Sequence, residues 1–90
     1  MMHRYDDPSG IELHKETKWL RFIIVGRKPK TLVINVYNKN EQSLGEIAWC
    51  PALRQYTFMS EDGTLYNDGC LDDIKGVLTD LNKAHKDGSK

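Results

Sequence analysis

Residues 67–88 read NDGCLDDIKGVLTDLNKAHKDG, and this stretch predicts one long amphipathic helix. Its apolar side chains recur at the i, i+3 and i+7 spacings that place them on one face of a helix. The members of that face are Leu71, Ile74, Leu78, Leu81 and His85. A helix with a single apolar stripe must bury it against another layer, so the fold depends on the residues that precede it.

Residues at both ends of this predicted helix indicate where it begins and where it ends. Asn67 or Asp68 can serve as the N-cap, because a short polar side chain accepts a hydrogen bond from an orphaned amide of the first turn. Aspartates in the first turn and lysines in the last match the helix dipole, and Gly88 just past the end is a usual stop. Gly76 in the interior costs about 1 kcal/mol relative to alanine, and we expect a close approach to the sheet to explain it.

The preceding sequence alternates short apolar runs with polar turns. Four β-branched or aromatic segments, 18–25, 31–37, 44–50 and 53–59, predict strands. Because the loops between them are short, the strands should form an antiparallel meander. The predicted fold class is therefore α+β, a two-layer ββββα domain of about four strands and one C-terminal helix. Residues 9–14 fit either a short helix or an extended segment entering the sheet.

The alternation assigns side chains to the two faces of the predicted sheet. The face toward the helix is expected to hold Leu32, Ile34, Val36, Ile47, Trp49, Tyr56 and Phe58. The opposite face is expected to hold Trp19, Val25, Val33, Tyr37, Leu53 and Met59. One helix cannot cover both faces. Either the N-terminal arm folds over the second face, or that face binds a partner or a second copy of the chain.

Length and composition fit one small globular domain. The 90 residues divide into an arm (1–10), a domain (11–87) and a short tail (88–90). Lysine plus arginine equals aspartate plus glutamate, 13 each, which lacks the positive surplus typical of sequence-blind nucleic-acid binders. No run approaches the ~20 apolar residues of a membrane span, and the N-terminus lacks the apolar core of a signal peptide. We expect a cytoplasmic protein that does not enter a membrane.

No arrangement of reactive side chains predicts catalysis. The three histidines are scattered, and neither cysteine has metal-site spacing or a visible base, so we expect no enzyme activity, no cofactor and no metal. Cys50 and Cys70 are expected to be free, buried thiols. The paired carboxylates Glu61-Asp62 and Asp72-Asp73 fit turn and helix-end chemistry better than acid–base work.

A basic cluster is the remaining local signal. Arg27, Lys28 and Lys30 lie in the first hairpin loop, Arg21 precedes them, and Tyr37 stands on the next strand. Such a set could hold phosphates and stack bases, as sheet-based RNA binders do. The competing interpretation, which we favour, is that these charges protect sheet edges against aggregation.

Four segments together resemble a group of small phage and prophage proteins. The segments are Leu44-Gly45-Glu46-Ile47-Ala48-Trp49, Leu53-Arg54-Gln55-Tyr56-Thr57-Phe58, Cys70-Leu71-x-x-Ile74 and Leu78-x-x-Leu81-Asn82. The group's pattern is L-G-x-I-x-W, W-R-Q-Y-x-F, C-L-x-x-I and L-x-x-L-N, and it covers about half the chain. The chain departs from it at Leu53, where the group has tryptophan, and at Met59-Ser60, where proline would follow the aromatic residue.

This resemblance implies an accessory role without assigning an activity. Most matching positions are expected core residues. Arg54 and Gln55 are the exceptions, so they are candidates for a binding surface. The leading hypothesis is a non-catalytic phage-type accessory or host-interaction protein that binds a protein, either a host factor or its own copy, in the host cytoplasm. The alternative is a nucleic-acid-binding module using Arg21, the basic loop and Arg54.

Overall fold

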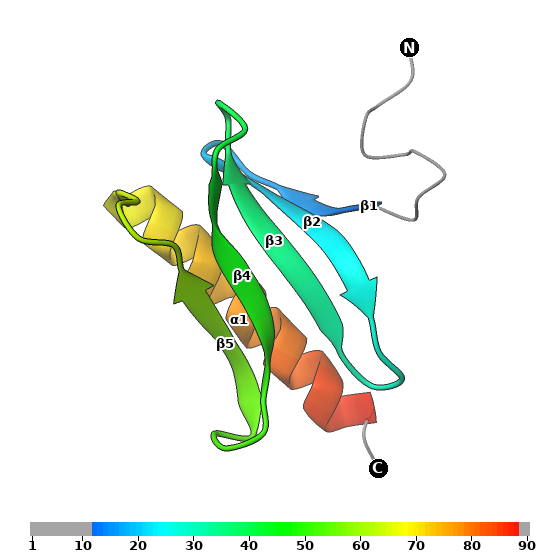
Figure 1. The fold of residues 1–90 in the computed structure, drawn as a ribbon. Helices are drawn as coiled ribbons and strands as arrows, with labels where there is room; N and C mark the ends of the chain where they lie inside the picture. Colours follow the sequence, from blue (N-terminus) through cyan, green and yellow to red (C-terminus); the bar gives the residue numbers. More distant parts are fainter. Residues whose placement is uncertain (1–11, 89–90) are drawn as a thin grey trace.

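The structure, a computed structural model, describes residues 12–88 and consists of one sheet and one helix. The elements are β1 (Glu12–Glu16), β2 (Leu20–Arg27), β3 (Leu32–Asn38), β4 (Ser43–Cys50), β5 (Gln55–Ser60) and α1 (Asp68–Gly88). The sheet order is β1-β2-β3-β4-β5, and every neighbouring pair is antiparallel. Figure 1 shows this meander with α1 across one face, so the predicted two-layer α+β fold is confirmed.

The sheet has five strands where the sequence predicted about four. The additional strand is β1, which settles the described part of the ambiguous segment 9–14 as extended backbone. All five residues of β1 are exposed, so no buried alternation marks it in the sequence. It exists because its main chain pairs with β2, with Leu13 opposite Ile23. The predicted arm, residues 1–10, and residues 89–90 lie outside the described residues, whereas Gly88 of the predicted tail belongs to α1.

The helix begins where its capping signal predicts. The side-chain Oδ1 of Asn67 accepts a hydrogen bond from the backbone N–H of Cys70 at 2.7 Å, so Asn67 is the N-cap. The buried stripe is rotated slightly from the predicted one. Val77 is buried and Leu78 only partly, while Leu71 is 52% exposed although the spacing placed it in the core.

The core lies between α1 and the helix-facing side of the sheet, as predicted. Alternate residues of the strands supply Leu20, Phe22, Ile24, Ile34, Val36, Ile47 and Tyr56, the irregularity in the β3–β4 pairing adds Leu44, and α1 supplies Cys70, Ile74, Val77 and Leu81. Leu32, Trp49 and Phe58 pack at its border. All seven side chains that the alternation assigned to this face therefore contact the core.

The close approach that we expected at Gly76 occurs instead at Gly69. A Cβ at Gly76 would meet nothing within 4 Å outside its own helix, so that expectation is wrong. A Cβ at Gly69 would lie 2.8 Å from Cδ1 of Trp19, whose indole rests on the first turn of α1. Trp19 thus belongs to the helix side of the molecule and not to the opposite face where the sequence placed it.

Gly76→Ala is therefore expected to stabilise the protein by about 0.5–1 kcal/mol, because alanine has the better helix propensity and the position is open. The measurement is the free energy of unfolding in urea. Gly63→Ala is the matched control: Gly63 is also open but has φ +77°, and alanine should cost about 1 kcal/mol there. A destabilised Gly76→Ala protein would contradict the open space seen at this helix position.

Candidate functional site

A cleft of about 450 Å³ opens between the β2–β3 loop and the C-terminal part of α1. Its floor is largely apolar and its rim is cationic. The residues that line it are Arg27, Lys28, Pro29, Lys30, Thr31, Leu32, Tyr56, Leu81, Ala84 and His85. No acidic side chain is among them. The cleft thus combines apolar surface with an excess of positive charge.

Tyr56 lies in the floor of this cleft, and its side chain and its main chain both form hydrogen bonds that hold it in place. Its hydroxyl accepts a hydrogen bond from the backbone N–H of Leu32 at 3.0 Å, which ties β5 to the start of β3. Its own N–H donates to Oδ1 of Asn82 on α1 at 2.6 Å. His85 stacks on Trp49 with ring centroids 4.1 Å apart. These contacts hold the end of the helix against the sheet and keep the cleft open beside the loop.

The rim is the basic loop that the sequence singled out. Arg27, Lys28 and Lys30 are all exposed, and the structure brings them together around one opening. Arg27 Nη2 forms an ion pair with Oε1 of Glu12 on β1 at 2.7 Å. Both partners are more than half exposed, so solvent screens this pair and the rim stays cationic overall.

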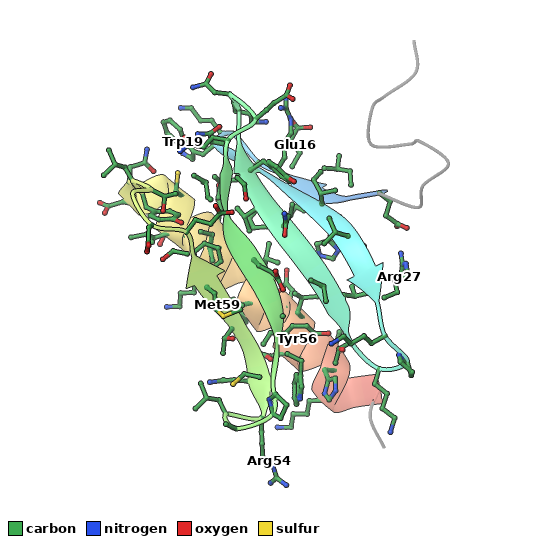
Figure 2. All side chains as sticks on the ribbon, in the orientation of Figure 1. Glu16, Trp19, Arg27, Arg54, Tyr56 and Met59 are labelled. Atoms are coloured by element: carbon green, nitrogen blue, oxygen red, sulfur yellow. The ribbon has the colours of Figure 1, made fainter. Side chains whose placement is uncertain are left out.

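The zero net charge conceals a separation of charge along the molecule. The β2–β3 loop, the β4–β5 turn with Arg54, and the last helical turn with His85 and Lys86 lie at one end, as Figures 1 and 2 show. Asp68 and its acidic neighbours occupy the first turns of α1, and about fifteen residues at 1.5 Å each separate those turns from the basic end. A negatively charged partner would therefore orient toward the cleft.

The structure places the other predicted site residues in two further positions. Arg21 and Tyr37 are cross-strand neighbours on the face opposite α1, where the Tyr37 hydroxyl accepts a hydrogen bond from Asn35 at 3.3 Å. Arg54 and Gln55 are exposed at the β4–β5 turn, with Arg54 in the left-handed region at φ +56°. The seven predicted residues thus form three separate groups and not one continuous surface.

Arg21 is also engaged in an ion-pair network at the end of the sheet opposite the cleft. Its Nε lies 3.2 Å from Oε2 of Glu16, and Lys39 contacts the same oxygen. The hydrogen bond from Lys39 lowers the pKa of the Glu16 carboxyl. On β1, His14 is exposed as a whole residue, but partial desolvation of its imidazole lowers the pKa of this side chain, an effect that the charge of Lys15 reinforces. These charges connect β1 to its neighbours and are not directed at the cleft.

Four apolar or aromatic side chains of the cleft, those of Leu32, Tyr56, Leu81 and His85, were not assigned to a site by sequence reasoning. Each was identified, but only as part of the core pattern. The Leu81–His85 spacing was the available signal, because it carries the apolar stripe into the last turns of the helix. Only the packing of α1 beside the β2–β3 loop shows that this last turn forms a cleft wall.

On the sheet face opposite α1, the sequence assigned the strand residues correctly. Val25, Val33, Tyr37 and Met59 alternate with core residues and so point away from α1. Leu53 lies in the turn before β5 instead. Val25 and Met59 are exposed, so part of this face is apolar and open among the described residues.

The described residues hold few other reactive groups. Within 12–88, no three histidine, cysteine or acidic side chains gather as metal ligands would. Cys50 and Cys70 are free thiols, as predicted, but only Cys70 is buried, whereas Cys50 is partly exposed because it ends β4 next to the β4–β5 turn. The one helix in this part of the chain is not long and apolar enough to cross a membrane. Comparison with protein-family models, curated proteins and solved structures finds no match to the chain.

Proposed function

We propose that this chain is a small non-catalytic accessory protein of phage or prophage type, and that it acts by binding an acidic segment of another protein at its cationic cleft. The observation that carries this proposal is the cleft itself. Three basic side chains surround an apolar floor, and no acidic side chain that the structure describes lines it.

The two parts of the cleft favour a mixed ligand. Carboxylates on the partner would contact Lys28 and Lys30, which are exposed and form no ion pair with another described residue. Apolar side chains of the same segment would cover Leu81 and Ala84. The C-terminal end of a helix carries partial negative charge, so carboxylates should prefer the loop side of the cleft to the helix side. A peptide with acidic and apolar residues meets both requirements.

A charge reversal at the rim tests this proposal. The tagged protein, with nuclease present, is used to recover partners from a bacterial lysate. The double variant Lys28→Glu/Lys30→Glu should lose the partner that the unmodified chain recovers. With that partner purified, calorimetry should show binding at least about tenfold weaker, or 1.4 kcal/mol, for the variant.

The matched control is Lys18→Glu/Lys75→Glu. It changes the net charge equally, and both lysines are exposed outside the cleft. It should retain the partner. If both double variants bind the purified partner as tightly as the unmodified chain does, the cleft is not the binding site and the proposal is wrong.

Nucleic acid is the second candidate, because three cations in one loop can also contact phosphates. The structure separates Arg21 from this loop by the length of β2, roughly 20 Å at 3.3 Å per residue, so the patch is smaller than the sequence predicted. A fluorescent single-stranded RNA is the probe. Binding whose affinity falls by about one log unit per log unit of salt for each phosphate contact would favour this candidate. Absence of binding at low salt would remove it.

A further inference from the structure

The outer edge of β5 offers main-chain groups that the rest of the fold does not use. Strand β5 is last in the sheet order, so one of its edges has no neighbouring strand. The N–H of Tyr56 donates to Asn82 instead of β4, and the N–H of Glu61 donates back to Leu44. Hydrogen-bonding direction alternates along an antiparallel strand. Tyr56, Phe58 and Ser60 therefore direct their main-chain groups outward.

Within the described residues, Tyr56 is the only one of these three residues whose outward main-chain group has a hydrogen-bond partner. Asn82 on α1 occupies the Tyr56 N–H. Among residues 12–88, no hydrogen bond from another segment reaches the outward N–H and C=O groups of Phe58 or Ser60. An unpaired row of this kind is a template for another strand.

The two edge strands of the sheet differ in their protection against pairing with another chain. Strand β1, at the other edge, reads ELHKE, and its pairing with β2 contains an irregularity between Leu13 and Lys15. Charges and bulges are the usual protection of an edge strand. Strand β5 reads QYTFMS, has no charged residue or proline, and keeps an unbroken register with β4. The molecule thus protects one edge and leaves the other able to pair.

Exposed apolar side chains lie on both sides of this open edge. Met59 is 59% exposed on the sheet face opposite α1. On the helix side, the first turns of α1 extend past β5 in the view of Figure 1, and they carry Leu71, which is exposed although its spacing predicts a core position. A strand added beyond β5 would lie where it could cover both side chains.

We propose that two copies of this chain associate through their β5 strands, paired antiparallel about a two-fold axis at Met59, to form one continuous sheet. In this register Phe58 exchanges main-chain hydrogen bonds with Ser60 of the second copy, and Ser60 with Phe58. These are the two positions that Asn82 leaves open. A register centred on Phe58 would instead require the Tyr56 N–H, which Asn82 already occupies.

A second copy suits this edge because the two-fold axis brings identical residues together. Like charges facing each other across paired strands are destabilising, and β5 has none. The axis places Met59 opposite Met59 in a non-hydrogen-bonded pair, where side chains approach most closely.

The first test measures mass by light scattering across a concentration series. The unmodified chain should reach the mass of two chains at high concentration. Met59→Lys, which brings two ammonium groups face to face, should stay at the mass of one chain. Val25→Lys is the control, because Val25 lies on the same face with 45% exposure but on β2, away from the edge. It should still dimerise.

The second test examines the register. Met59→Cys should form an intermolecular disulfide on mild oxidation, since Cα atoms about 4.5 Å apart in such a pair are within disulfide range. Val25→Cys should not. A chain that remains monomeric at near-millimolar concentration, or that dimerises equally well with Met59→Lys, would overturn the proposal. Circular dichroism confirms that each variant is folded.

Discussion

Gly45→Ala is expected to destabilise the fold by about 3 kcal/mol, at the upper end of the usual cost of adding a methyl group to a packed interior. Gly45 is buried in β4, between Val36 of β3 and Ser60 of β5. A Cβ there would contact the main-chain oxygen of Met59 and lie 2.8 Å from Cε1 of Phe58. The ring can rotate away, but a carbonyl in the ladder cannot move without opening the β4–β5 pairing.

The measurement is equilibrium unfolding in urea, monitored by the fluorescence of the tryptophans. Gly76→Ala is the internal control, since it makes the same chemical change at a position with open space and should shift stability in the opposite direction. A loss below about 1 kcal/mol for Gly45→Ala would mean that β5 can shift away from β4 at little cost.

Phe22→Ala should have the largest effect on stability, a loss of about 3–5 kcal/mol. Phe22 is fully buried at the centre of β2, opposite Val36 on β3, and it contributes to the core beneath α1. Truncation removes the apolar area of the ring and leaves a cavity that the surrounding strands cannot close without breaking their register. In a domain of this length such a loss is a large part of the total stability.

Val25→Ala provides the comparison on the same strand. Its side chain is exposed on the other face, so its loss should cost less than about 1 kcal/mol. Both variants are compared by denaturant midpoint and slope, because a changed slope would indicate altered compactness and not stability alone. Similar losses for the two positions would contradict the assignment of the core to the helix side of the sheet.

The helix and the meander followed from the sequence because their signals are local. An N-cap lies three residues from the amide that it binds, as Asn67 does for Cys70, and short loops compel neighbouring strands to pair. Strand β1 could not be predicted in this way. Its only apolar residue is Leu13, and its extended conformation depends on pairing with β2.

The sequence also could not predict exactly which residues of α1 are buried. Cys70 and Leu71 point about 100° apart around the helix axis, and the direction in which α1 crosses the sheet decides which of them is covered. The same holds for Gly76 and Gly69. Both are helical glycines in the sequence, but only Gly69 has the indole of Trp19, from a distant turn, resting against it.

By itself, the sequence determined the α+β class, the start of the helix, the alternation that builds most of the core, and the basic loop at 27–30. Tertiary structure decided that this loop borders a cleft with Tyr56 and His85, and that β5 is an edge strand capped, within residues 12–88, only by Asn82. The physical reason is the distance along the chain over which each signal acts. Propensity, capping and alternation act over a few residues, whereas a cleft or a sheet edge exists only when segments that are distant in the chain come together.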